Sequence, residues 1–223
     1  VFKSFRNVPQ LKKKNKLKVV EQQKGPRIAL HYKKTDQAHI VLGFRTFPVS
    51  DPRGASLQVL NAVLGSGMSS RLFQTLREKM GAGYYVRSGV DDLTDHGYFA
   101  ISTGADTRRV QGVVEAILSL CKDMKENLVP EEELRKSKES LIGNFVMSLE
   151  SSDAVATFVA DQELLKRKIE KPQDIEKKIR EVTAEEVRNL ARTIFSDKNL
   201  NLAIVGNIKN GTLLEAILKV GSE

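Results

Sequence analysis

The segment from residue 65 to residue 86 concentrates the side chains most able to do chemistry in this sequence. It reads GSGMSSRLFQTLREKMGAGYYV, with close glycines, paired serines, arginines and paired tyrosines. A phosphate-binding loop needs its glycines between a strand and the N-terminus of a helix, because amide groups and the helix dipole must face the anion. Gly65-Ser66-Gly67 instead follows a helical pattern, and the sequence contains no Gly-Lys-Ser/Thr. These glycines therefore indicate a turn between two helices rather than a nucleotide site.

The histidines do not form a zinc motif in the sequence. His31 and His39 fall in predicted strands and His96 in a predicted loop, and none begins an H-x-x-E-H or H-x-x-E pattern. A metal site would require all three to converge in space. We therefore expect ordinary structural or surface histidines and no metal ligands in this chain.

Nucleophilic residues are equally poor candidates for catalysis. The sequence has no G-x-S-x-G, and its one S-x-x-K match, Ser119 to Lys122, lies inside an amphipathic helical pattern where chance explains it. Cys121 lies in the same apolar pattern, so we expect a buried structural thiol. A single cysteine excludes an internal disulfide and a multi-cysteine zinc site. It is also compatible with a reducing compartment, which favours the cytoplasm.

The positive charge of the chain is concentrated at its N-terminal end. Residues 1–35 hold 11 Lys and Arg and one acid, Glu21, for a net charge of 11 − 1 = +10, whereas the rest holds 25 − 27 = −2. The run KKKNKLK at residues 12–18 has no accompanying aromatic residues that could stack on bases. We therefore predict a solvated basic linker at residues 1–26 and no nucleic-acid partner. No apolar run approaches the roughly 20 residues of a membrane span, so we expect no membrane partner.

Hydrophobic periodicity and turn signals divide the remaining chain into strands and helices. The run AHIVLGFRTF at residues 38–47 predicts a strand buried on both faces. Asp51 and Pro52 predict the N-cap and first residue of the next helix, and Thr183-Ala-Glu-Glu186 predicts a capping box. The other predicted strands are 27–31, 84–91, 97–103 and 200–206. The predicted helices begin near 51, 69, 107, 130, 152 and 183, with a short helix at most in the tail.

The order of these elements predicts the fold class. A hairpin implies antiparallel pairing, and the helices come in blocks rather than alternating singly with strands. We therefore predict an α+β fold in which helices pack on one face of a largely antiparallel sheet. Residues 27–223 should form one such domain.

The block around residues 70–84 resembles the pitrilysin/insulinase family of zinc metallopeptidases, which includes the mitochondrial processing peptidase. The family pattern is roughly S-R-L-F-x-x-L-R-E-K-x-G-x-x-Y, and this sequence has SRLFQTLREKMGAGY from Ser70 to Tyr84. The segments AHIVLGFRT, PEEELRKSKESLIGNF, SLESS and VTAEEVRNLA also match in order and spacing, as does the turn at Asp95-His96-Gly97. The resemblance covers about residues 27–206. It implies a processing-peptidase-like half with the same α+β architecture.

The resemblance implies roles for two residues. In this family one domain carries the zinc motif H-x-x-E-H, and a homologous domain without it supplies an Arg and a Tyr to the substrate. By motif position these are Arg77 and Tyr84, as substrate-binding residues, with Tyr84 also catalytic. Because Gly83 is followed by two tyrosines, a slip of one position would make Tyr85 the functional ring instead. Arg71 should be structural and cap neighbouring carbonyl groups.

The chain therefore looks like the non-zinc C-terminal domain of a zinc metalloendopeptidase. It would hold no cofactor and cleave nothing alone, because the zinc would sit on a partner domain or subunit. The expected substrate is an unfolded peptide, and a homo-oligomer could form through the face that the partner domain covers. The alternative is a non-catalytic assembly subunit, like the core subunits of respiratory complex III. A weaker alternative is a nucleic-acid adaptor that uses the basic arm.

Overall fold

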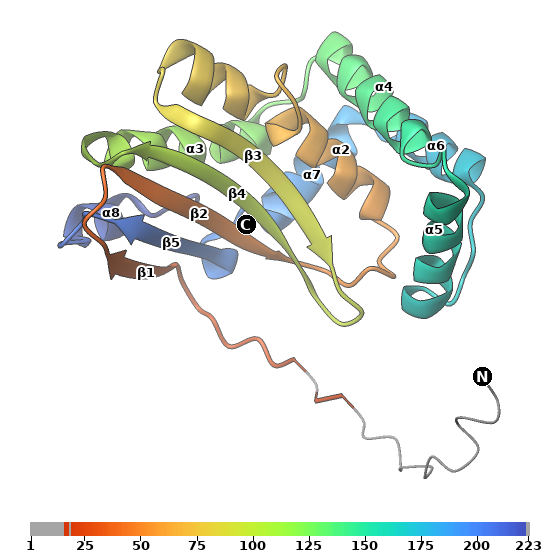
Figure 1. Ribbon diagram of the computed structural model, residues 1–223, viewed down its shortest axis with the longest axis horizontal. Helices are drawn as coiled ribbons and strands as arrows, with labels where there is room; N and C mark the ends of the chain where they lie inside the picture. Colours follow the sequence, from red (N-terminus) through yellow and green to blue (C-terminus); the bar gives the residue numbers. More distant parts are fainter. Residues whose placement is uncertain (1–15, 18, 222–223) are drawn as a thin grey trace.

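Burial alternates along the strands and divides the central sheet into a covered face and an open face. The computed structural model describes residues 16, 17 and 19–221. Figure 1 shows helices packed behind the sheet and the strands toward the viewer. The strands are β1 (Arg27–Tyr32), β2 (Gln37–Thr46), β3 (Gly83–Asp92), β4 (Gly97–Asp106) and β5 (Leu200–Gly206).

The helices lie in two groups, one against the sheet and one beyond it. They are α2 (Gly54–Gly65), the π-helix η1 (Phe73–Lys79), α3 (Val110–Glu126), α4 (Glu131–Met147), α5 (Ser152–Leu165), α6 (Pro172–Glu181), α7 (Ala184–Ile194) and α8 (Thr212–Ile217), with 3-10 turns η2 (Thr107–Arg109) and η3 (Asp197–Asn199). The first group contacts the sheet: α2 packs on β3, α3 on β4 and α7 on β2. The second group contains α4 and α6, which pack on α2 and on each other. No helix in the described part of the chain is long and apolar enough to span a bilayer.

The strand order is β1-β5-β2-β4-β3. Only the β1–β5 pair is parallel, and the other three pairs are antiparallel. The predicted α+β class and the largely antiparallel sheet are therefore confirmed. The predicted hairpin is the β3–β4 pair.

Strand β2 departs from its prediction. We expected burial on both faces, but Ala38, Ile40, Leu42 and Phe44 are buried while the side chain of Val41 is 41% exposed. A continuous apolar run signals two-sided burial only where helices cover both faces of a sheet. Here they cover one face, so the residues between the buried ones point to solvent.

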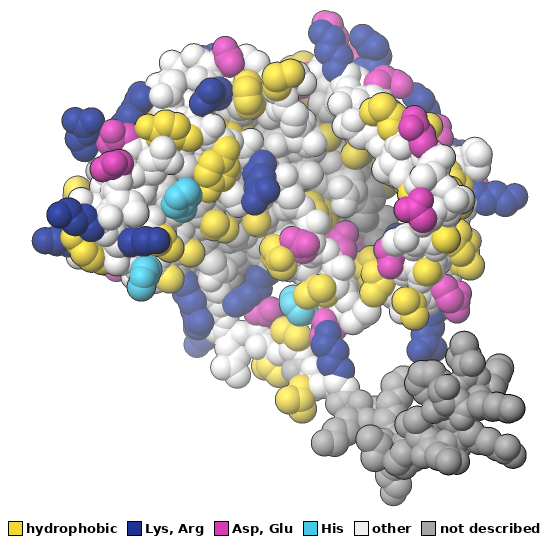
Figure 2. Space-filling model, viewed as in Figure 1, with side chains coloured by type: hydrophobic (Ala, Val, Ile, Leu, Met, Phe, Trp, Pro, Cys, Tyr) yellow, Lys and Arg dark blue, Asp and Glu magenta, His cyan; other side chains and the backbone are white. Residues whose placement is uncertain are grey.

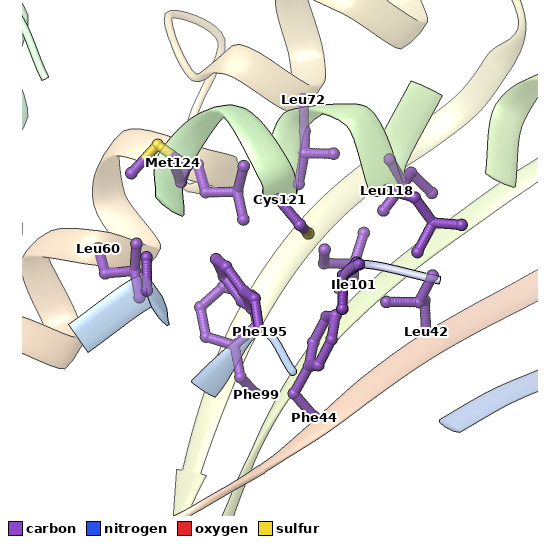
Figure 3. Packing of buried hydrophobic residues seen from close by; sticks show 14 of the residues in the cluster. Leu42, Phe44, Leu60, Leu72, Phe99, Ile101, Leu118, Cys121, Met124 and Phe195 are labelled. Atoms are coloured by element: carbon purple, nitrogen blue, oxygen red, sulfur yellow. The ribbon is translucent and has the colours of Figure 1, made fainter. Parts of the chain in front are cut away.

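Aromatic residues from three separate segments meet in the core between sheet and helices. The ring of Phe195, just after α7, lies 4.8 Å from the ring of Phe44 and 5.5 Å from that of Phe99. Figure 3 shows these rings facing Cys121 and its neighbours on α3. The predicted burial of the Cys121 thiol is confirmed, and burial raises its pKa.

Two helix predictions need correction. Helix α2 begins at Gly54 rather than at Pro52, and its N-cap, Arg53, makes no side-chain capping bond. The carboxylate of Asp51 accepts bonds from the backbone and side chain of Arg53, so it closes the turn before the helix. Helix α6 was not predicted, although Pro172 at its first position is a common helix start.

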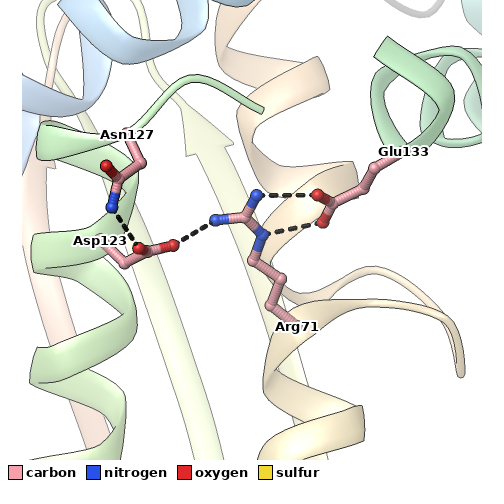
Figure 4. Close-up of polar contacts among 4 residues, drawn as sticks. All are labelled: Arg71, Asp123, Asn127 and Glu133. Carbon is pink, nitrogen blue, oxygen red and sulfur yellow. Dashed lines mark hydrogen bonds and ion pairs between the residues drawn. The ribbon is translucent and has the colours of Figure 1, made fainter. Parts of the chain in front are cut away.

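Arg71 links three helical segments, as Figure 4 shows. Its guanidinium donates two hydrogen bonds to Glu133 on α4, at 2.8 and 2.7 Å, and one to Asp123 on α3 at 2.6 Å. Asn127 donates to the other oxygen of Asp123 at 2.7 Å. The predicted structural role is confirmed, but the predicted capping of carbonyl groups is wrong because carboxylates occupy the guanidinium.

The described part of the basic arm contacts the sheet. Lys16 pairs with Asp95 at 2.7 Å, Glu21 pairs with Arg45, and the amide of Gln23 donates to the Leu200 carbonyl at 2.9 Å. Residues 1–15 and 18 of the predicted linker lie outside the described residues. The division into a linker at 1–26 and a domain at 27–223 stays a prediction.

Candidate functional site

Arg77 lies on the π-helix η1, where we had predicted an ordinary helix from about residue 69 to 79. Leu76 on η1 and Leu72 just before it are buried in the core, whereas Arg77 is exposed. The wide turns continue past the end of the helix, because Met80 donates to the Thr75 carbonyl at 3.0 Å. Such π-turns are rare in proteins, and those that occur are frequently found at functional sites.

Arg77 reaches the first residues of strand β3. Its Nη1 donates to the carbonyl of Gly83 at 2.9 Å and to that of Tyr84 at 3.3 Å. Gly81 has a φ of +55°, which glycine adopts without strain and which permits the sharp reversal between η1 and β3. The structure thus brings Arg77 and Tyr84 to one corner of the sheet, as their spacing predicted.

Tyr84 occupies a β-bulge. Gly83 pairs with Ala105 and Tyr85 pairs with Gly104, so Tyr84 is the extra residue on the β3 side. Bulges often re-aim a side chain beside an active site. The side chain of Tyr84 is 56% exposed, and no hydrogen bond among the described residues uses its hydroxyl. That hydroxyl can therefore donate to a ligand.

Tyr85 has the opposite surroundings. Its hydroxyl lies 3.1 Å from Nδ1 of His39, and the two rings stack with centroids 6.1 Å apart. Its ring also lies against Gly104, where an added Cβ would approach the ring to 2.8 Å. Tyr85 is therefore held on the open face by its neighbours, and this geometry favours Tyr84 as the ring that is free to meet a substrate.

A hollow of about 330 Å³ lies beside these residues. Arg77, Gly83 and Tyr84 form one side of it, and Arg108 and Arg109 contribute from the turn before α3. Arg109 donates to the carbonyls of Met80 and Gly81 at 2.6 and 3.0 Å. It thus satisfies carbonyl groups at the C-terminal end of η1, where helical backbones leave them without partners.

The three histidines lie apart. His31 and His39 both pair with Val205, from opposite sides of β5, so they are two strands and roughly 10 Å apart. His96 lies in the β3–β4 loop and bonds Asp95 at 2.7 Å. Among the described residues no three His, Cys, Asp or Glu side chains are grouped so that they could hold a metal ion.

The remaining nucleophile candidates have structural surroundings. Ser119 is exposed on α3, and Lys122 pairs with Glu126 at 3.8 Å instead of approaching the serine. Sequence reasoning missed His39, Gly104 and Arg109 as neighbours of the site. No signal in the sequence pointed to them, because strand pairing and the turn before α3 bring them there.

A family model described as the peptidase M16 inactive domain matches residues 1–141. An uncharacterized zinc protease of Bacillus subtilis, YmxG, is 36% identical over 165 residues, which is 74% of this chain and 40% of that protein. An uncharacterized zinc protease of Streptomyces coelicolor is 32% identical over 188 residues, or 82% of this chain and 40% of that one. The chain thus spans about 40% of the length of these relatives.

Solved structures share the fold at lower identity. A protease from Helicobacter pylori superposes with a TM-score of 0.81 at 23% identity, over 92% of this chain and 50% of that one. A peptidase M16 inactive domain from Pseudomonas fluorescens gives 0.78 at 20% identity, over 86% and 47%. A chain of complex III2 from Candida albicans gives 0.76 at 16% identity, over 88% and 49%.

Proposed function

Because the chain belongs to the family of the peptidase M16 inactive domain, we propose that it is the substrate-binding domain of a zinc metalloendopeptidase. The zinc-bearing partner is a second domain or subunit, and the substrate is an unfolded peptide. The names of the curated relatives, which are zinc proteases, support this proposal. So does the length of those relatives, which leaves room for a second domain.

One observation carries the proposal. Arg77 and Tyr84 meet at one corner of the sheet, and the Tyr84 hydroxyl has no partner among the described residues. A phenol O–H that donates to the carbonyl oxygen under attack stabilises the negative charge that develops there. Zinc, when bound by the partner domain, would polarise that carbonyl and its attacking water.

Arg77 has two tasks in this scheme. One nitrogen already holds the carbonyls of Gly83 and Tyr84, which fixes the bulge and thereby the direction of the Tyr84 ring. A guanidinium has five N–H donors, so the remaining donors can bind a peptide carbonyl and set the register of the substrate.

The test uses a preparation that contains both this chain and its zinc-bearing domain. Tyr84→Phe should lower kcat for peptide hydrolysis by about 10²-fold, the usual effect of removing one oxyanion donor. Arg77→Ala should lower kcat/KM at least as much, since it removes a substrate contact and loosens the bulge. Tyr85→Phe is the matched control, because it removes a hydroxyl that bonds His39, and it should leave kcat within about threefold.

Hydrolysis that is unchanged by both Tyr84→Phe and Arg77→Ala would refute these roles. A larger loss from Tyr85→Phe than from Tyr84→Phe would transfer the catalytic role to Tyr85. Circular dichroism and urea unfolding of each variant separate a loss of activity from a loss of folding.

The alternative is an assembly subunit without catalysis, and the fold similarity to a chain of complex III2 supports it. An H-x-x-E-H motif in the zinc-bearing position of the partner would favour the peptidase. Its absence, together with a stable stoichiometric complex, would favour the assembly subunit.

A further inference from the structure

The hollow beside Tyr84 carries an excess of positive charge. Its charged residues are Arg77, Arg108, Arg109 and one acid, Asp106, which gives a net charge of 3 − 1 = +2. Arg108 donates to both oxygens of Asp106 at 3.2 and 3.1 Å, and its backbone N–H donates as well, at 2.9 Å. These bonds lower the pKa of Asp106, which keeps it ionised and committed to the η2 turn.

The other two guanidiniums lack such a partner. Within the described ranges, no carboxylate oxygen lies within ion-pair distance of Arg77 or Arg109. Their observed bonds all go to backbone carbonyls: Arg77 to Gly83 and Tyr84, and Arg109 to Met80 and Gly81. Among the described residues neither guanidinium donates a hydrogen bond to a carboxylate, although the charge of Arg109 helps to lower the pKa of Asp106.

We propose that this hollow binds a carboxylate of the peptide substrate, and that Arg109, whose observed bonds go only to backbone carbonyls, makes the protease selective for it. This proposal rests on the proposed function, since it adds a side-chain subsite next to the carbonyl that Tyr84 contacts. Arginine and carboxylate form short, charge-assisted and often bidentate hydrogen bonds. A carboxylate among these guanidiniums also offsets their mutual repulsion.

Two sources of the carboxylate fit the same chemistry. One is an Asp or Glu side chain within a residue or two of the cleaved bond, because the hollow adjoins Tyr84. The other is the free C-terminus of a short product-side segment. The hollow, at about 330 Å³, is large enough for either.

The test compares matched peptides on the preparation that contains this chain and its zinc-bearing domain. One pair differs only by Asp against Asn, scanned over the two positions on each side of the cleaved bond. A second pair differs only by a free C-terminal acid against an amide. We expect one acidic peptide to have about tenfold higher kcat/KM than its neutral partner, with the ratio falling as salt rises. The pair that shows the preference identifies the source of the carboxylate.

Variants assign the preference to this hollow. Arg109→Gln and Arg108→Gln should each lower the acidic-to-neutral ratio toward one while leaving the neutral peptide within about threefold. Arg87→Gln is the control, because Arg87 is exposed on the same strand β3, pairs with no acid in the described ranges, and does not line the hollow. It should leave the ratio unchanged. If Arg109→Gln unfolds because it uncaps η1, Arg108→Gln decides, because it leaves the Asp106 carboxylate unpaired in the hollow, where it repels a substrate carboxylate.

Binding provides a readout without catalysis. The same peptide pairs are titrated into this chain alone and followed by NMR chemical shifts of the Gly81–Tyr84 amides. Equal affinity and equal kcat/KM within both pairs would overturn the carboxylate subsite, as would an Arg87→Gln effect as large as that of Arg109→Gln. If binding prefers the carboxylate but Tyr84→Phe leaves hydrolysis unchanged, the proposed function is refuted and the carboxylate subsite is kept.

Discussion

At the scale of single residues, Asp92 is a carboxyl group whose ionised form is destabilised by folding. Burial at the end of β3 raises its pKa; Lys166 opposes and Asp91 adds to that shift. One of its carboxylate oxygens is buried without a hydrogen-bond partner. A raised pKa means that the folded state favours the protonated form, so stability falls as pH rises through the raised value.

Asp92→Asn should therefore stabilise the protein at pH 7, and the gain should shrink as pH falls from the raised pKa toward the ordinary value of about 3.9, below which little of it remains. Urea unfolding between pH 3 and 7 measures this. Asp161→Asn, on the exposed side of α5, is the control and should change the unfolding free energy by less than about 0.5 kcal/mol. A gain that grows toward low pH would contradict the prediction.

The residues of the site were predictable where local sequence positions them. Arg77 and Tyr84 are seven residues apart across a glycine reversal, so their meeting follows from the chain itself. The contact between Tyr85 and His39 was not predictable, since it depends on Gly104 lying between them in the paired strands. The ion pairs of Arg71 were not predictable either, because its partners Glu133 and Asp123 lie on two helices that are distant in sequence.

At the scale of elements, Gly65 on α2 and Gly143 on α4 differ in whether the fold has room for a side chain at that position. A Cβ on Gly65, at the end of α2, would lie 2.3 Å from Oγ of Ser88 and 2.7 Å from Leu72, so α2 approaches β3 closely only because this residue is glycine. A Cβ on Gly143, inside α4, would meet nothing within 4 Å. Glycine inside a helix otherwise costs about 0.5–1 kcal/mol relative to alanine.

We therefore expect Gly65→Ala to destabilise the fold by about 1–3 kcal/mol through overpacking, and Gly143→Ala to stabilise it by about 0.5–1 kcal/mol. Chemical denaturation of both variants gives the two values under one condition. Stabilisation by Gly65→Ala would show that α2 can move away from β3 at no cost.

Element boundaries followed from hydrophobic pattern and capping chemistry where both agreed. The Thr183–Glu186 capping box is present with both of its bonds, and the apolar stripe of α3 is buried. Prediction failed for β2, whose open-face residues Val41 and Gly43 are also apolar or small, so the alternation was hidden. It failed for η1 because widened helical turns leave no mark on the spacing of apolar residues.

At the scale of the whole molecule, the helices of the described residues cover one face of the sheet and leave its other face open. Figure 2, in the same view as Figure 1, shows hydrophobic and charged side chains interspersed there. The exposed side chains of Val41, Tyr85, Tyr98 and Val205 belong to this face. Domain organisation beyond this chain does not follow from its fold. The resemblance of the block at residues 70–84 suggests it, and the curated relatives, of which this chain spans about 40%, leave room for a second domain.

The proposed separation of the substrate-binding residues from the zinc site leads to a prediction for the isolated chain. A protein zinc site needs three or four N, S or O ligands, and the described residues offer no such group. Calorimetric titration of the chain with zinc should therefore show no stoichiometric binding tighter than about 1 µM. The preparation with the zinc-bearing domain is the positive control and should bind one equivalent. Stoichiometric tight binding by the chain alone would show that the metal site had been placed on the wrong domain.

The position of β5 has a consequence for how the chain is made. This last strand lies between β1 and β2, and it leaves the ribosome about 150 residues after β2. At about 5–20 residues per second, β1 and one edge of β2 wait roughly 8–30 seconds for their shared neighbour. During translation the nascent sheet thus holds an empty strand position, and any chaperone or foreign strand that enters it competes with β5.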